Sequence, residues 1–378
     1  MQQKILLSSP HMGGAEEKYV KEAFDTNWIA PLGNNVNEFE NQVKEFTGTK
    51  AACALSSGTG GIHIALDLLD VGQGDFVFCS SLTFIASANP ILYLGAEPVF
   101  IDSDLDSWNM SPVALKKAFE DYASKGQLPK AVVIVNLYGQ SAKMDELMAI
   151  CDEYGVAVVE DAAESLGSRY KGKMSGTFGK FGIYSFNGNK IITTSGGGMI
   201  VSDDEEMIQK ALKKATQSRD QAVHYQHSEV GYNYRLSNIS AGIGRGQMEV
   251  LEKRVEQKRA IFDRYVEALD HIDGIEFMPE LENTLHNRWL STLTVDSEKL
   301  GVTAAEIIEK LAKLNVEARP VWKPMHMQPL FAECDYYSEE QDNSKYLFET
   351  GICLPSDTKM TAEDQESVIE RIREKIHG

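Results

Sequence analysis

The sequence predicts an α/β protein, with a mainly parallel sheet flanked by helices in a large domain and a smaller C-terminal α/β domain after it. In the first half of the chain, short apolar runs alternate with amphipathic segments at helical spacing. Alternating strands and helices require right-handed crossovers, which produce a parallel sheet covered on both faces. The length of 378 residues also exceeds the usual size of one hydrophobic core. We therefore expect two domains, residues 1–250 and residues 251–378.

The individual elements follow from the spacing of apolar residues along the chain. Helices are expected over residues 14–25 and 35–47, from 59 onward, and near 83–94, 111–124 and 143–153. Strands are expected over residues 76–79, 97–101, 131–135 and 156–159. Residues 168–199 are rich in glycine, which suits turns and close approach of the backbone to a ligand. A long helix over 238–271 should lead into the second domain, with strands near 275–278 and 289–295 and helices at 303–314 and 362–376.

Charge and composition exclude several classes of protein. A net charge of −19 repels nucleic acid and anionic lipid, so we expect neither nucleic acid nor a membrane as partner. No apolar stretch approaches the roughly 18 residues of a membrane span, and residues 1–7 lack the apolar core of a signal peptide. The five cysteines are widely spread without a CxxC pair, which argues against disulfides and structural zinc. We expect a cytoplasmic protein without a metal site.

One lysine lies in a loop of small residues. The run from Ser185 to Gly198 places Lys190 after a strand and before hydroxyl residues and three glycines. A lysine that such a loop removes from water has a lowered pKa and a free amine for Schiff-base chemistry. The alternative is a surface lysine on a flexible loop, because glycine-rich turns are common.

A carboxylate stands at the end of a predicted strand upstream of this loop. Asp161 follows the apolar pair Val158 and Val159, and this position points into the crevice where open α/β sheets bind ligands. A carboxylate there can keep a pyridine nitrogen protonated, which makes the ring an electron sink. The alternative is a helix N-cap, because Glu164 three residues later matches a capping box.

A third segment, Leu-Ser-Ser-Gly-Thr-Gly-Gly at residues 55–61, precedes an apolar helix. Backbone amides at a glycine-rich helix N-terminus suit a phosphate, although a plain Ser/Thr cap is the alternative. The segment lacks the lysine of a nucleotide-triphosphate loop, and no GxGxxG follows the first strand. Together, a phosphate cradle, a strand-end Asp and a loop Lys in this order predict a pyridoxal-phosphate enzyme with the aspartate-aminotransferase-like fold (fold type I).

Several motifs resemble those of the DegT/DnrJ/EryC/StrS sugar aminotransferases, and the likeness covers nearly the whole chain. They are HMGG at 11–14, NWIAPLG at 27–33, SANPI at 87–91, NLYGQSAKMD at 136–145 and GYNYRLSN at 231–238. Within the family, the chain is similar to aminotransferases of exopolysaccharide operons and of the bacillosamine pathway.

The resemblance implies a reaction and a cofactor. The cofactor is pyridoxal 5'-phosphate, with pyridoxamine 5'-phosphate as its aminated form. Glutamate is the amino donor, and the acceptor is C4 of a UDP-linked 4-keto-6-deoxy-N-acetylhexosamine for surface or exopolysaccharide sugars. The expected assembly is a homodimer with composite active sites.

The resemblance also implies residue roles. Lys190 matches the catalytic lysine that forms the Schiff base, and Asp161 matches the partner of the pyridine nitrogen. Glu164 falls beside the cofactor's phenolic oxygen, where many family members carry Gln or His and the bacillosamine-type enzymes resemble this chain in having a carboxylate.

The remaining cofactor-binding residues concern the phosphate and the ring face. Gly58, Thr59 and Ser185 match phosphate ligands, and Phe84 matches the residue stacked on the ring. Asn233 matches a residue that reaches the phosphate from the partner subunit.

Substrate contacts are expected from a further set of residues, Asn27, Ile29, Arg235, Lys323 and His326. For Arg235 the alternative is a structural pair with a carboxylate. For His326 the alternative is a packing role in the small domain.

Two other functions fit parts of the pattern. A sugar dehydratase has the same fold, but this family tends to build it with histidine in place of the lysine, so Lys190 weighs against it. A non-catalytic cofactor- or sugar-binding regulator is disfavoured because the chain carries no appended DNA-binding segment and its net charge is −19.

Overall fold

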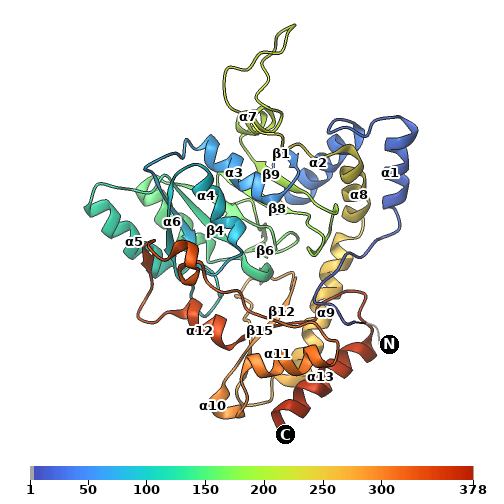
Figure 1. Cartoon of the computed structure of the whole chain (residues 1–378), viewed down its shortest axis with the longest axis vertical. Coiled ribbons are helices and arrows are strands. Elements are labelled where there is room, and N and C mark those ends of the chain that lie inside the picture. Colours follow the sequence, from blue (N-terminus) through green and yellow to red (C-terminus); the bar gives the residue numbers. More distant parts are fainter. Residues whose placement is uncertain (1–3, 378) are drawn as a thin grey trace.

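A mainly parallel sheet forms the centre of the larger part of the molecule (Figure 1). The computed structural model describes residues 4–377. Neighbouring strands from β8 to β14 are parallel, whereas β9 is antiparallel to both β8 and β1. In spatial order the eight strands are β1 (Ala51–Leu55), β9 (Gly198–Ser202), β8 (Phe181–Ser185), β5 (Ala157–Asp161), β4 (Ala131–Val135), β2 (Phe76–Ser80), β3 (Glu97–Ile101) and β14 (Tyr336–Tyr337). The predicted α/β fold class is confirmed.

Helices cover both faces of this sheet. They are α1 (Glu16–Asp25), α2 (Asn34–Thr47), α3 (Gly58–Leu68), α4 (Asn89–Tyr93), α5 (Pro112–Ser124), α6 (Met144–Tyr154), α7 (Glu205–Ala215) and α8 (Asn238–Met248). Side chains alternate along each strand, so Val77 and Cys79 of β2 pack in the core with α3, α4 and α7. Phe78 between them packs on the other face in the core with α5 and α6. The sheet is therefore buried on both sides, as its apolar strands require.

The C-terminal residues build a second layer below the large sheet in Figure 1. Its antiparallel sheet has the order β10 (Ile275–Phe277), β12 (Ser291–Val295), β15 (Gly351–Leu354) and β13 (Arg319–Pro320). The helices here are α9 (Leu251–Leu269), α10 (Ser297–Leu300), α11 (Ala304–Lys313), α12 (Asn343–Thr350) and α13 (Ala362–His377). A small sheet of β11 (Thr284–Leu285), β6 (Arg169–Tyr170) and β7 (Lys173–Met174) joins the two parts.

Two of the expected helices are wrong in their extent. The helix expected near 83–94 is a 3-10 turn, Ile85–Ser87, followed by the short α4, because Pro90 supplies no amide to a preceding turn. The helix expected over 238–271 is two helices, α8 and α9. Val250 between them leaves the helical region at φ −117° and ψ 4°, and its side chain lies so close to Gly13 that a Cβ added there would be 2.9 Å from Val250 Cγ1.

The division of the chain near residue 250 stays a prediction. The break between α8 and α9 falls there, yet segments from each side of residue 250 pack with the other side. Ile5 bridges Val316 in the C-terminal layer, and β14 adds a strand to the large sheet.

Three further features of the described chain concern membrane-spanning helices, metal-binding clusters and disulfides. Within residues 4–377, no helix combines the length and apolar character that a membrane crossing needs. The same residues contain no group of three His, Cys, Asp or Glu side chains arranged to hold a metal ion. All five cysteines are free. Residues 1–3, part of the N-terminal segment considered above, lie outside the described residues.

Small residues on α8 allow it to lie directly against α1, and this close approach can be tested. A Cβ added at Gly246 would lie 2.6 Å from the backbone nitrogen of Glu16, which cannot move without α1. We expect Gly246→Ala to lower the free energy of unfolding by about 1–3 kcal/mol, the usual effect of overpacking. Urea denaturation measures this. Gly72→Ala is the control, because a Cβ there meets nothing within 4 Å, and an equal loss in both variants would contradict the prediction.

Candidate active site

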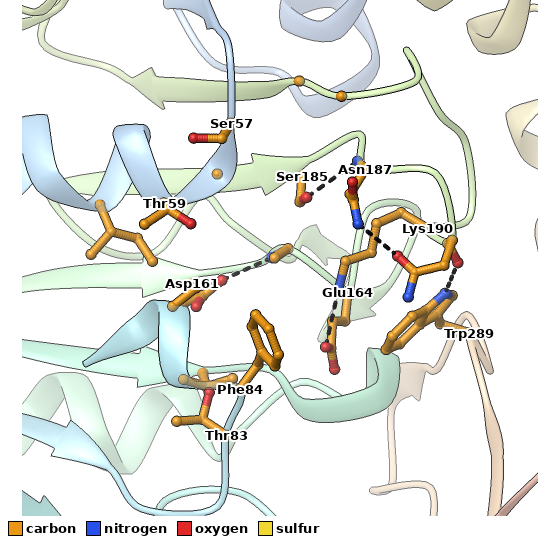
Figure 2. Close-up of a pocket in the computed structure, with 18 of the residues that line it drawn as sticks. Ser57, Thr59, Thr83, Phe84, Asp161, Glu164, Ser185, Asn187, Lys190 and Trp289 are labelled. Carbon is orange, nitrogen blue, oxygen red and sulfur yellow. Dashed lines mark hydrogen bonds and ion pairs between the residues drawn. The ribbon is translucent and has the colours of Figure 1, made fainter. Parts of the chain in front are cut away.

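A cavity of about 370 Å³ opens at the carboxyl ends of β5 and β8, beside the N-terminus of α3 (Figure 2). Ligand sites of open α/β sheets lie at this edge of the sheet. Most of the side chains expected to bind a cofactor line it together, namely Gly58, Thr59, Phe84, Asp161, Glu164, Ser185 and Lys190. Segments more than 100 residues apart in the chain therefore meet in one cavity.

Asp161 is the last residue of β5 and is only 6% exposed. Its Oδ2 accepts a hydrogen bond of 2.6 Å from Ser87 Oγ, and its Oδ1 accepts one of 3.1 Å from the amide of Ala163. Burial raises the pKa of this carboxyl, although the Ser87 hydrogen bond opposes the shift. Asp161 is followed by turns at residues 163–167 and not by a helix. The helix-cap alternative is therefore excluded, and the buried carboxylate gains most from a cationic partner in the cavity.

Lys190 and Glu164 form an ion pair inside the cavity. Lys190 Nζ lies 3.2 Å from Glu164 Oε1, and their side chains are 11% and 4% exposed. Glu164 Oε2 also accepts a hydrogen bond of 2.7 Å from the amide of Tyr138. Burial raises the pKa of Glu164, while the positive charge of Lys190 opposes this rise. Because its amine is enclosed and paired, Lys190 is not a surface lysine on a flexible loop.

Trp289 completes the surroundings of Lys190, and sequence reasoning missed it. Lys190 Nζ lies 4.1 Å from the centre of the indole ring, within the range of a cation–π contact. The indole Nε1 donates a 2.8 Å hydrogen bond to the carbonyl of Asn189. From the sequence, Trp289 was only the start of an apolar strand, and no local signal placed it against a residue 99 positions earlier. Trp322 and Phe84 extend this aromatic wall, with ring centres 5.4 Å apart.

The N-terminus of α3 forms the opposite end of the cavity. Ser57 caps the helix through its side chain, so the cap alternative is correct for this residue. Gly58 and Thr59, whose amides are the first of the helix, line the cavity together with Ser185 at the end of β8. A Cβ at Gly58 would lie 3.3 Å from Cβ of Ser185, so glycine keeps this corner open. The Ser57 cap therefore leaves the amides of Gly58 and Thr59 able to bind an anion.

Two of the expected substrate residues are engaged elsewhere. The side chain of Arg235 is 8% exposed and its Nη1 lies 2.5 Å from Glu40 Oε1, which favours the structural pair over a substrate contact. His326 lies 2.7 Å from Ser81 Oγ and 3.0 Å from Asp342 Oδ2. Its ring also stacks on Tyr336. These contacts favour the packing alternative for His326.

Other expected residues lie outside the cavity lining. Asn27 and Ile29 are exposed, and Lys323 is half-buried beside the lining residue Trp322. Asn233 is also exposed, at the base of the segment that projects between α7 and α8 at the top of Figure 1. Within one chain, these side chains do not reach the cavity.

Comparison with known proteins gives these features a family. A sequence model of the DegT/DnrJ/EryC1/StrS aminotransferase family matches residues 10–373. EpsN of Bacillus subtilis (strain 168), named as a candidate pyridoxal phosphate-dependent aminotransferase, is 60% identical over 379 residues, covering 100% of this chain and 97% of that protein. A GDP-perosamine synthase of Escherichia coli O157:H7 is 35% identical over 373 residues, covering 98% of each chain.

Solved structures agree with the sequence relatives. An aminotransferase of this family from Brucella abortus has a TM-score of 0.89 and 26% identity, with 96% of each chain covered. The candidate sugar aminotransferase Spr1654 from Streptococcus pneumoniae, in its PMP form, has a TM-score of 0.90 and 25% identity, covering 99% of this chain and 98% of that one. The predicted fold and the resemblance are confirmed.

The Lys190–Glu164 pair predicts a specific dependence of stability on pH. A carboxyl whose folded pKa is raised stabilises the fold at low pH, and this contribution is lost as pH rises through the folded pKa. Because Lys190 holds the pKa of Glu164 down, Lys190→Met should raise that pKa further. We expect the variant to lose up to about 3 kcal/mol of unfolding free energy relative to the wild type, with the deficit growing as pH rises above the ordinary carboxyl pKa of about 4.3.

Urea denaturation of ligand-free protein at a series of pH values above this pKa measures the deficit. The double variant Lys190→Met/Glu164→Gln is the control, because it has no carboxyl to titrate at this position. A deficit independent of pH in the single variant would show that the two side chains are not coupled.

Proposed function

Because the chain belongs to the DegT/DnrJ/EryC1/StrS aminotransferase family, we propose that it moves an amino group from glutamate to C4 of a UDP-linked 4-keto-6-deoxy-N-acetylhexosamine. The general activity, without a particular substrate, is that of a pyridoxal phosphate-dependent sugar aminotransferase. One observation carries the proposal: the amine of Lys190, the carboxylate of Asp161 and the N-terminus of α3 share a single cavity. The product would serve surface or exopolysaccharide synthesis.

The residues of the cavity fit the chemistry of pyridoxal phosphate. Asp161, buried and with a raised pKa, would pair with the ring nitrogen and keep it protonated. Gly58, Thr59 and Ser185 would hold the phosphate, since helix amides and a hydroxyl suit an anion. The exposed ring of Phe84 in the cavity wall would lie against the cofactor ring. When bound, the cofactor supplies an electron sink that stabilises negative charge at the carbon losing a proton.

Lys190 is the residue that we assign to proton transfer. Its Nζ would take a proton from the carbon that carries the donor's amino group, and would later return a proton to C4 of the sugar. Glu164 and Trp289 hold the amine from two sides, which orients Nζ toward the cavity. The enclosed position of the amine also limits competition from water. These features support transamination over dehydration, for which histidine was expected at this position.

The nucleotide of the sugar substrate has a second candidate, GDP. The proposal of UDP rests on the resemblance to exopolysaccharide and bacillosamine enzymes. Three relatives at 34–35% identity are named GDP-perosamine synthases, which favours a GDP-linked sugar instead. Both nucleotides therefore belong in the test.

A homodimer would bring Asn233 to a cavity. The segment between α7 and α8 projects from the body of the chain and exposes Val223, Tyr225 and Val230. Exposed apolar side chains of this kind mark a surface that a partner covers. We propose that this segment carries Asn233 to the phosphate end of the partner's cavity, so that each active site is composite. In a twofold dimer each subunit gives the contact that it receives.

The proposed reaction can be tested with a panel of UDP- and GDP-linked 4-keto sugars and glutamate as donor. We expect amino-sugar formation with the UDP-linked N-acetylated compound, followed by mass spectrometry, and no turnover by Lys190→Ala. The variant should also lose the visible absorption band of the lysine-bound cofactor, because no amine remains to form the link. Turnover retained by Lys190→Ala would remove the lysine from its role, and turnover only with GDP-linked sugars would select the second candidate.

Mixed dimers test the composite site. Lys190→Ala and Asn233→Ala should each be inactive, but a hybrid of the two carries both changes in one site and neither in the other. Subunit exchange should therefore restore up to about half of the activity of one dimer per hybrid. Activity and native mass spectrometry of the mixture measure this. If Asn233→Ala is inactive and verified hybrids stay inactive, the asparagine acts within its own subunit.

A further inference from the structure

The first described residues form a strap that crosses the molecule beside the active site. This N-terminal strap, residues 5–13, lies over α9 and over the loop that follows β15. The carbonyl of Leu7 accepts a hydrogen bond from the amide of Ser356, and Arg254 of α9 donates to the carbonyls of His11 and Met12. The strap is thus tied to the C-terminal layer along its length.

A buried lysine of α9 lies beneath the strap. Lys258 is 2% exposed, and its Nζ donates a 3.0 Å hydrogen bond to Ser8 Oγ. Burial lowers the pKa of this amine to about 7, while the charge of Asp357 partly opposes the shift. Enclosing an amine in this way is unfavourable unless its hydrogen bond is kept. The hydroxyl of Ser8 is therefore held in one place.

The Ser8 hydroxyl connects this lysine to the active-site loop. Ser8 Oγ donates a 2.9 Å hydrogen bond to the carbonyl oxygen of Asn189. The same oxygen accepts the 2.8 Å hydrogen bond from Trp289 Nε1. On the other side of this peptide, the amide of Lys190 donates to the carbonyl of Asn187. The planar Asn189–Lys190 peptide is thus held at both edges, which fixes the direction in which the Lys190 side chain leaves the backbone.

We propose that Lys258 and Ser8 are positioning residues for the reacting amine of Lys190. Lys258 orients the Ser8 hydroxyl, Ser8 holds the Asn189 carbonyl, and the same carbonyl holds the indole of Trp289 against the amine. This inference rests on the proposed function of Lys190. In this proposal Lys258, which lies in the C-terminal layer, stabilises the conformation of the loop that carries Lys190.

A purely structural strap would behave differently, and the chain offers a matched control. The neighbouring hydroxyl, Ser9, donates to Asp357 and does not touch the active-site loop. Ser9→Ala therefore weakens the strap without releasing Asn189. Ser8→Ala removes the link to the loop, and Ser8→Thr keeps a hydroxyl at the same position. Lys258→Met removes the amine and keeps an unbranched apolar chain.

Hydrogen–deuterium exchange of the holoenzymes measures the effect without relying on activity. We expect exchange in the peptide covering residues 187–194 to rise roughly fivefold to tenfold in Ser8→Ala and Lys258→Met, as expected for the loss of one hydrogen bond. Ser8→Thr and Ser9→Ala should exchange as the wild type does. In the transfer of the amino group from glutamate, kcat should fall about fivefold in Ser8→Ala with KM changed by less than about twofold, because orientation and not binding is lost.

Either of two results overturns the inference: wild-type exchange of the loop in Ser8→Ala, or an equal rise in Ser9→Ala. If Lys258→Met does not fold, the Ser8→Ala and Ser8→Thr pair still decides the question. If the exchange pattern is as expected but the wild type aminates no sugar of the panel, positioning of Lys190 is supported and the proposed reaction is the part that fails.

Discussion

The burial of carboxylates at the end of β5 is the constraint on which the architecture of the site depends. Glu160, Asp161 and Glu164 are all buried, and burial raises the pKa of each. A buried carboxylate is tolerated only where donors or cations surround it. Glu160 accepts the amides of Gly176 and Phe178, which anchors the glycine-rich region. The three acids thus hold different parts of the chain around one strand end.

Glu164 shows how far this constraint extends. The amide of Tyr138 donates a hydrogen bond to the Glu164 carboxylate. Tyr138 itself has a φ of 53°, a backbone conformation that non-glycine residues rarely adopt. Asn287, from the segment before β12, donates to the carbonyls of Glu164 and Leu166. It comes so close to Gly139 that a Cβ there would lie 1.8 Å from its side-chain oxygen. The C-terminal layer is therefore docked directly onto the strand end that carries the acids.

This docking also explains why the surroundings of Lys190 come from separate parts of the chain. The amide of Trp289 donates to the side chain of Asn287, so the contact that fixes the C-terminal segment also places the indole against Lys190. The carbonyl of Asn189 then receives the indole N–H and the Ser8 hydroxyl. A displacement of the C-terminal layer would be transmitted to the reacting amine through these hydrogen bonds. Rigid support of this kind suits a group that must transfer protons between fixed atoms.

The sequence by itself determined the features that depend on local chemistry. Apolar periodicity predicted β2, β3, β4 and β5 of the parallel sheet. The position of Asp161 at a strand end and the small-residue segments around Lys190 and Gly58 predicted that these residues form the site, and all three line the cavity. Tertiary structure alone decided which distant side chains meet. It placed Trp289 on Lys190, and it paired Arg235 with Glu40, 195 residues earlier in the chain. It also divided the helix expected over 238–271, where Val250 packs at Gly13. Such contacts depend on how the layers pack, and the spacing of residues along one segment carries no information about its neighbour across the fold.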